Sequence, residues 1–267
     1  ANFSIGSTEA PRLVASQLLL GGATQTGDIV VKGAASFSNL SSSGTATFQT
    51  AGAFNAGSTL SSPGNITIIA DTGIAFTQTG ATAMTSTVTL TSANGAITSA
   101  NANTDVSAGV LVASANGGIS IDAAVSNVSL TNANSGGITF TNTTGVNIDA
   151  ISQPVGNLNF KAGGAITQTG AISANAETAT FNAGTTGDIT LANTSNDFGT
   201  VTIAAGRNVS VKDANALTFN GSAFGGQLQV EAKSGDLTVA GDNVYSGGGA
   251  NTATFLSDKS VLVLGGA

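Results

Sequence analysis

The sequence predicts an all-β protein, a right-handed parallel β-helix (β-solenoid) with the form of an elongated rod. Glycine accounts for 36 of the 267 residues and charged residues for only 8%, a composition unlike that of an ordinary soluble enzyme. Apolar and polar residues alternate in short runs that recur every ~8 to 12 residues between clusters of Gly, Asn, Asp and Ser. Helical periodicity is nearly absent. Strands this short bury most apolar surface when each stacks in parallel on its equivalent in the next coil, about 4.8 Å away.

The predicted strands each contain apolar residues at alternate positions, and their β-branched and aromatic side chains favour extended backbone. In chain order they are 65–69, 88–90, 119–121, 128–130, 138–140, 146–148, 189–191, 201–203, 209–211, 228–230 and 237–239. We expect three such strands in each coil of ~20 to 25 residues, with Val, Ile, Leu, Phe and Ala facing inward. Most of the twelve phenylalanines fall at strand positions, and we expect these to stack in the core: Phe76, Phe140, Phe160, Phe181 and Phe219.

Internal repetition favours a wound solenoid over a sandwich. Residues 66–90, 158–181 and 228–255 share one frame of strand, glycine turn, second strand and Thr-rich closing strand. Their turns differ in length, which is typical of large irregular β-helices. We expect residues 1–64 to form less regular N-terminal coils or a cap-like region, and residues 65–267 to form the repetitive coils.

Residues 166–221 resemble the repeats of filamentous-haemagglutinin-like bacterial exoproteins and autotransporter adhesin passengers. The phrases that carry the resemblance are 167–170 (TQTG), 178–181 (TATF), 187–191 (GDITL), 196–198 (NDF) and 213–217 (DANAL). The resemblance extends over residues 65 to 255 and implies a right-handed parallel β-helix, exported through the outer membrane by a β-barrel partner or domain. The sequence contains no two-partner secretion motif and no membrane-barrel strands, so we expect a segment or subunit of a larger fibre.

The sequence offers little catalytic chemistry. It contains no histidine and no cysteine, which excludes imidazole bases, thiolate nucleophiles and the usual zinc ligands. The acids are nearly all solitary, and Asp28, Asp188 and Asp236 each follow a glycine, where we expect them to accept backbone hydrogen bonds at turns. We therefore predict that the chain is not an enzyme and has no catalytic residue, cofactor or metal.

Charge and hydropathy limit the partners. The net charge of −7 and the scattered Lys and Arg residues argue against nucleic acid and anionic membranes. No apolar run approaches the ~18 residues of a transmembrane helix, so we predict no membrane insertion.

Two surfaces are candidates for binding. Residues Val261, Leu262, Val263 and Leu264 form an apolar strand without a capping helix or polar loop, and we predict that it mediates self-association. The densest polar cluster comprises Arg207, Asn208, Lys212 and Asp213. This cluster is either an exposed contact patch or a solvated turn between two strands.

The resemblance implies an extracellular bacterial protein, secreted or held at the cell surface. The first hypothesis is a structural or adhesive fibre segment, a rigid rod that stacks end to end on copies of itself or on adjacent segments of a larger exoprotein. The alternative is an adhesin module that binds host glycan or a surface protein, although the chain has no Trp and only one Tyr, Tyr245. A further alternative is an ice- or surface-binding solenoid built on Thr-x-Thr runs whose spacing along the chain is uneven. Those runs are 77–79, 139–143, 167–169, 178–180 and 252–254.

Overall fold

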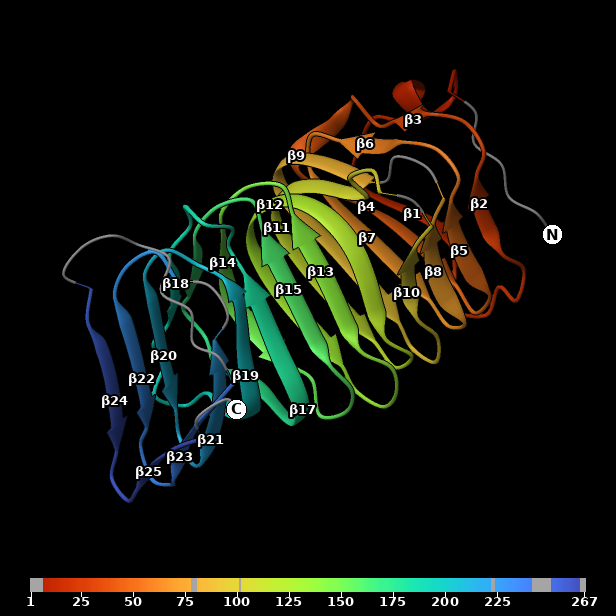
Figure 1. Cartoon of the computed structure of the whole chain (residues 1–267). Coiled ribbons are helices and arrows are strands. Elements are labelled where there is room, and N and C mark those ends of the chain that lie inside the picture. Colours follow the sequence, from red (N-terminus) through yellow and green to blue (C-terminus); the bar gives the residue numbers. More distant parts are fainter. Residues whose placement is uncertain (1–6, 78–80, 101, 222–223, 242–250, 265–267) are drawn as a thin grey trace. The chain divides into compact units, whose positions relative to one another are not determined.

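The computed structural model of the chain describes residues 7–77, 81–100, 102–221, 224–241 and 251–264. The chain divides into two compact units, Ala1–Ser135 and Gly136–Ala267, which are described separately. Within each unit nearly every element is a strand, and the strands pair in parallel (Figure 1). The predicted fold class is therefore confirmed as an all-β parallel β-solenoid. In the described part of the chain, the only helical segment is the 3₁₀ turn η1 (Ala10–Arg12), and no described helix is long and apolar enough to cross a membrane.

The first unit stacks its strands in three parallel ladders. Its strands are β1 (Ala15–Gly21), β2 (Ile29–Val31), β3 (Ala35–Ser36), β4 (Leu40–Thr50), β5 (Ala53–Ala56), β6 (Leu60–Ser62), β7 (Asn65–Ala70), β8 (Gly73–Phe76), β9 (Ala81–Ser92), β10 (Ile97–Ser99), β11 (Val106–Ala115) and β12 (Ile119–Asn132). One ladder runs β1, β4, β7, β9, β11, β12, and a second runs β2, β5, β8, β10, β12. The third ladder contains β3 and β6 and then parts of β9, β11 and β12. The longest strands bend from one ladder into the next, which closes each coil.

Coil length varies while the register is maintained. The inward positions Ala46, Ile66, Val88, Leu111 and Val128 align in one column, so successive coils contain 20, 22, 23 and 17 residues by difference. Most of these lengths match the predicted coil of ~20 to 25 residues. The turns and a register shift within the pairing of β9 with β11 absorb the extra residues.

The second unit repeats this scheme. Its strands are β13 (Ile138–Asn142), β14 (Val146–Ser152), β15 (Leu158–Ala162), β16 (Ile166–Gln168), β17 (Ile172–Asn182), β18 (Ile189–Leu191), β19 (Asp197–Ala205), β20 (Val209–Asp213), β21 (Leu217–Gly221), β22 (Leu228–Ala232), β23 (Leu237–Ala240), β24 (Ala253–Ser257) and β25 (Val261–Val263). One ladder runs β13, β15, β17, β19, β21, β23, β25, and another runs β14, β16, β18, β20, β22, β24.

The core consists of aligned inward columns. Buried and outward residues alternate along the strands, as in β7, where every second residue is buried. Ten phenylalanines are buried among the described residues, including all five of the predicted core positions. Phe140, Phe160 and Phe181 lie in one column with ring centroids 4.8 and 6.0 Å apart, within the range of favourable aromatic pairs.

Polar residues occupy the corners of the coils, where the backbone leaves the ladder. Asn196 is fully buried and bonds to the preceding and the following coil: its Oδ1 accepts from Ile172 N at 3.0 Å, and its Nδ2 donates to Gln168 Oε1 and Lys212 O at 2.9 and 3.1 Å. Buried amides of this kind satisfy backbone groups that the bend removes from the ladder.

Every predicted strand lies within an observed one, so the strand predictions are confirmed. The paired coils begin earlier than the predicted repetitive region, because β1 to β6 already stack in parallel register between Ala15 and Ser62. The boundary between the two units lies after Ser135.

Candidate functional site

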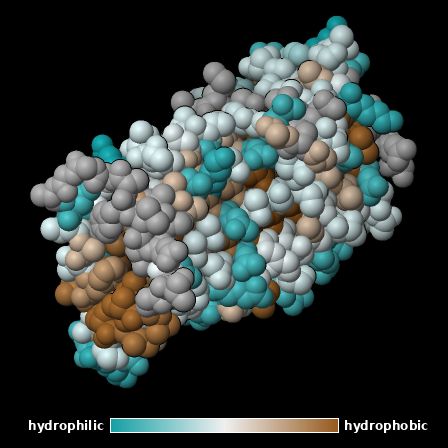
Figure 2. Space-filling model, viewed as in Figure 1, coloured by the Kyte–Doolittle hydropathy of each residue, from teal (hydrophilic) through white to brown (hydrophobic). Residues whose placement is uncertain are grey.

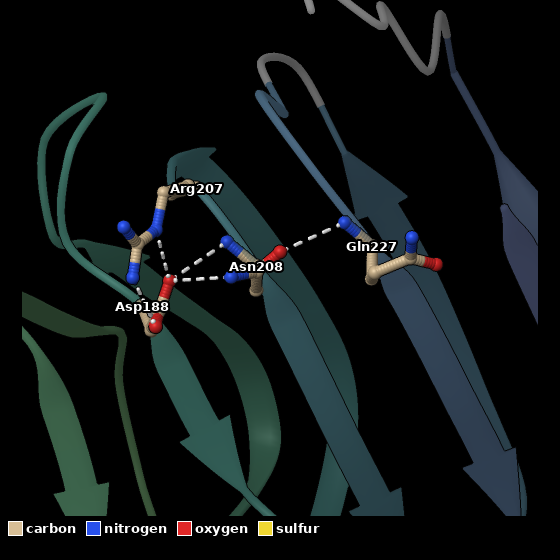
Figure 3. A network of polar contacts seen from close by, with 4 residues as sticks. All are labelled: Asp188, Arg207, Asn208 and Gln227. Atoms are coloured by element: carbon tan, nitrogen blue, oxygen red, sulfur yellow. Dashed lines mark hydrogen bonds and ion pairs between the residues drawn. The ribbon is translucent and has the colours of Figure 1, made fainter. Parts of the chain in front are cut away.

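A polar ladder runs along one turn column of the second unit, at the position just before each strand of one sheet. Asp188 precedes β18, Asn208 precedes β20 and Gln227 precedes β22. The Asp188 carboxylate accepts both nitrogens of Asn208, the backbone N–H at 3.1 Å and Nδ2 at 3.0 Å. Asn208 Oδ1 in turn accepts the Gln227 backbone N–H at 3.0 Å (Figure 3). The ladder therefore connects three successive turns.

Arg207 joins this ladder from the solvent side. Its Nε and Nη2 donate to the two oxygens of Asp188 at 2.8 and 2.7 Å, a bidentate ion pair (Figure 3). The hydrogen bonds from the Arg207 guanidinium are the main reason why the pKa of Asp188 falls to about 2, and the Asn208 donors act in the same direction. Asp188 is thus held ionised, with its oxygens occupied by the next coil.

The other two residues of the predicted polar cluster lie at the far end of β20. Lys212 pairs with Glu231 of the next coil at 2.8 Å, and both are half-buried. Asp213 is completely buried, so it cannot belong to an exposed patch. Its oxygens accept the backbone N–H groups of Phe198 at 2.7 Å and Asn215 at 2.9 Å. The four residues are close in sequence but do not form one surface, because Lys212 and Asp213 lie at the end of β20 opposite to the turn of Arg207 and Asn208, and Asp213 is buried.

The acids that follow a glycine accept hydrogen bonds at turns, as predicted, but their donors lie on the next coil. Asp28 accepts the backbone N–H of Ala53 at 2.9 Å, and Asp188 accepts that of Asn208. Asp236 accepts the Ser260 hydroxyl at 2.6 Å. In each case the donor lies 20 to 25 residues later. These acids therefore tie one coil to the next.

The burial of two carboxyl groups, those of Asp105 and Asp213, was not predicted from the sequence. Asp105 is fully buried, and its oxygens accept Asp122 N at 2.9 Å and Ser99 Oγ at 3.2 Å. Burial raises the pKa of Asp105 to about 6, with the nearby Asp122 charge adding to the effect. Burial also raises the pKa of Asp213. Each carboxyl group holds the backbone at a corner, and only the coil geometry shows that both side chains point inward.

The predicted self-association strand is the most exposed apolar surface of the second unit. Val261, Leu262, Val263 and Leu264 are 42, 53, 64 and 49% exposed, and Leu256 on β24 is 43% exposed. Figure 2 shows the apolar cluster at the lower left, over the region of β23 to β25. Val261 and Val263 align with Leu237 and Val239, which are buried in the core columns. They are exposed because no described strand covers this side of β25.

A threonine column occupies the outer face of the second unit. Thr178, Thr200, Thr218 and Thr238 lie in register on β17, β19, β21 and β23. All four are partly exposed. The sequence separations are uneven, 22, 18 and 20 residues by difference, yet the side chains form a continuous row. The turns between these strands differ in length, so the threonines align in space although their sequence separations differ. The column is therefore not apparent from the Thr-x-Thr runs alone.

The described residues contain no group of three or more acids, His or Cys able to hold a metal ion. Tyr245, the single tyrosine of the sequence, lies outside the described residues. Three of the acids at turns, Asp28, Asp188 and Asp236, have their oxygens in contact with the next coil. The arrangement is suited to holding coils together.

Comparison with known proteins identifies a similarity to one repeat family. A family described as repeats of unknown function (DUF5649) matches residues 135–205 and 206–261, so most of the second unit is similar to those repeats. No curated protein and no solved structure matches the chain. The resemblance to filamentous-haemagglutinin-like exoproteins remains a prediction.

Proposed function

We propose that this chain is a structural segment of a secreted bacterial surface exoprotein, a β-solenoid spacer that acts through the number and rigidity of its coils. The observation that carries the proposal is the continuity of the inward columns: within the second unit the register passes without interruption from Ile138 through Leu158 and Ala179 to Val201. Such a stack transmits force through many parallel hydrogen bonds and a dry core.

The side-chain chemistry supports the same role. The two ion pairs described in the second unit, Asp188 with Arg207 and Lys212 with Glu231, each join adjacent coils. Tying coils together is what a spacer requires of its surface. The similarity to repeats of unknown function fits a modular protein.

The proposal is tested by locating the full-length protein in its native cells. Antibodies against the folded chain should label intact cells or recover the protein from the medium, and external protease should remove the signal without lysis. A cytoplasmic protein as a lysis control should stay intact. Labelling that appears only after lysis would contradict the extracellular role.

The threonine column supports a second candidate function, the binding of ice or another ordered, hydroxyl-rich surface. Thr178, Thr200, Thr218 and Thr238 place one hydroxyl and one methyl group per coil, with a spacing of about 4.8 Å between strands. A regular row of uncharged groups suits a surface that is itself periodic.

This second candidate predicts inhibition of ice recrystallisation, or retention on a crystalline polysaccharide, by the wild-type chain. Replacing the two central residues, Thr200→Lys and Thr218→Lys, should abolish binding. Thr190→Lys on β18 is the matched control, because Thr190 is exposed in a different ladder. Equal binding by the control and the double variant would exclude the threonine column as the contact surface.

A further inference from the structure

We propose that Asn94 is a site of spontaneous deamidation in the folded chain, and that the carboxylate formed there weakens the contact between two coils of the first unit. The modification is independent of where the protein acts. It is indicated by two turns that share the sequence Ser-Ala-Asn-Gly, residues 92–95 and 114–117, but differ in their backbone hydrogen bonds.

The two turns occupy the same position on successive coils. Asn94 N donates to Asp71 O at 2.7 Å, and Asn116 N donates to Gly95 O at 3.3 Å, so each turn is bonded to the coil before it. Asparagine is a chemically labile residue, and a glycine after it leaves the amide carbon open to attack because glycine has no Cβ. The third Asn-Gly pair of the sequence, 220–221, lies within β21 in parallel register with β19.

The reaction begins at the backbone nitrogen of the glycine. This nitrogen loses its proton to hydroxide and attacks Cγ of the asparagine. The new C–N bond closes a succinimide ring, and Nδ2 takes up a proton from water and leaves as ammonia. Water then opens the ring and leaves an aspartate or an isoaspartate in place of the asparagine. A hydrogen bond from the glycine N–H opposes the first step, because that bond must break before the proton can leave.

The backbone hydrogen bonds leave one of the two turns open to this reaction. Gly117 N donates to Gly95 O at 2.9 Å. Gly95 N lies outside the strands and donates no hydrogen bond within the described part of the chain. The Asn94 side chain is also exposed, whereas that of Asn116 is half-buried. In the folded chain Asn94 should therefore lose its amide roughly tenfold faster than Asn116, a factor that one hydrogen bond can contribute.

Both residues of the reactive pair are needed by the fold. A Cβ at Gly95 would lie 1.9 Å from Thr72 O, so a larger residue would break the close approach of this turn to the preceding coil. Asn94 contacts the same coil, because its Nδ2 donates to Asp71 Oδ1 at 2.6 Å. The labile sequence is thus part of the contact that joins the two coils.

Deamidation changes this contact from attraction to repulsion. The product has no amide hydrogen to donate, and its carboxylate faces that of Asp71 across the distance of the former hydrogen bond. Two like charges so close disfavour each other. An isoaspartate also routes the main chain through the former side chain, which lengthens the turn by one carbon atom. Either product loosens the first unit at this position.

The first experiment follows the loss of the amide in the folded full chain. Wild-type protein is incubated in mildly alkaline buffer, and peptide mass spectrometry measures deamidation at each of the three Asn-Gly pairs. Hydroxylamine, which cleaves the chain at a reactive Asn-Gly bond, should cut the folded protein first after Asn94. The control is the same incubation in urea, where residues 92–95 and 114–117 should react at similar rates because their sequences are identical.

The second experiment tests the consequence by urea unfolding of variants that fix the product. Asn94→Asp should lower the unfolding midpoint more than Asn94→Ser, which removes the amide without adding a charge. Adding Asp71→Asn to Asn94→Asp should recover much of this loss, because the amide and the carboxylate then exchange places.

Three results would overturn the proposal. Amide loss at Asn116 that equals or exceeds that at Asn94 in the folded chain would show that the free N–H does not select the site. A preference for Asn94 that persists unchanged in urea would show that the fold does not create it. Equal midpoints for Asn94→Asp and Asn94→Ser would show that the new carboxylate does not repel Asp71.

Discussion

The buried carboxyl group of Asp105 makes the stability of the first unit depend on pH. Its pKa rises from 3.8 to about 6, chiefly because burial disfavours the ionised form. Protonation is then easier in the folded chain than in the unfolded chain. The stabilisation is complete below pH 3.8 and is lost as the pH rises through about 6.

The magnitude follows from the same pKa values. A displacement from 3.8 to about 6 corresponds to about 3 kcal/mol. We expect the free energy of unfolding of the first unit to fall by up to ~3 kcal/mol between pH 4 and pH 7 on account of Asp105 alone. Asp105→Asn should remove this dependence, since an amide stays neutral and its oxygen can still accept the Asp122 N–H.

The assay is urea unfolding of wild-type and Asp105→Asn protein at half-unit steps from pH 4 to pH 7.5. The difference between the two curves should grow with pH, with the variant the more stable at pH 7. Asp213→Asn is the companion variant, because burial raises the pKa of Asp213 in the second unit. Parallel curves for wild type and Asp105→Asn over the whole range would refute the reasoning.

Further substitutions test packing and the contacts between coils by chemical denaturation at pH 7. Phe181→Ala should lower the free energy of unfolding by about 3 to 5 kcal/mol, because Phe181 is fully buried between two other rings. A loss smaller than that of a surface substitution would show that the aromatic column does not stabilise the core. Asp188→Asn should lower the free energy of unfolding by about 1 kcal/mol, a modest value because the ion pair is partly exposed. Adding Arg207→Ala to this variant should lower it little further, since both substitutions remove the same interaction. The wild-type contribution of this pair should be present above pH 3.8 and fade as the pH falls towards about 2. Gly170→Ala should destabilise the chain because a Cβ would lie 1.7 Å from Asp149 O, whereas Gly33→Ala, with open space around it, should not.

The alternation of apolar residues was enough to predict the fold. Val209, Val211 and their equivalents on β22 alternate with polar residues in the sequence, and they occupy the inward columns in the structure. Short apolar runs with period two and glycine turns allow few other arrangements. Even the irregular turns were predicted, because repeated segments of unequal length cannot stack with a fixed period.

The candidate sites were less predictable, because they depend on which residues of different coils become neighbours. Arg207 was identified as polar and exposed, but its partner Asp188 lies one coil earlier. Asp213 was assigned to the same polar cluster as Arg207, but its side chain is buried at a corner of the coil. The register between coils decides these contacts, and turns of variable length conceal that register in the sequence. For the same reason, the alignment of Thr178 with Thr200 could not be predicted from the sequence.

The central claim is that the coils are equivalent modules, and excision of one coil tests it most directly. Val209 aligns with Ile189 on one side and with Leu228 on the other. Removing residues 209–227 joins Asn208 to Leu228 and takes out one coil without changing the alternation. A crystal structure of the shortened chain should show Ile189 paired with Leu228 and Thr200 paired with Thr238, with cooperative unfolding retained. Removing residues 209–226 instead exchanges the inward and outward residues after the junction, and this variant should lose much of its stability. If the in-register excision fails to fold, or both excisions unfold alike, the coils are not interchangeable and the account of a modular spacer is wrong.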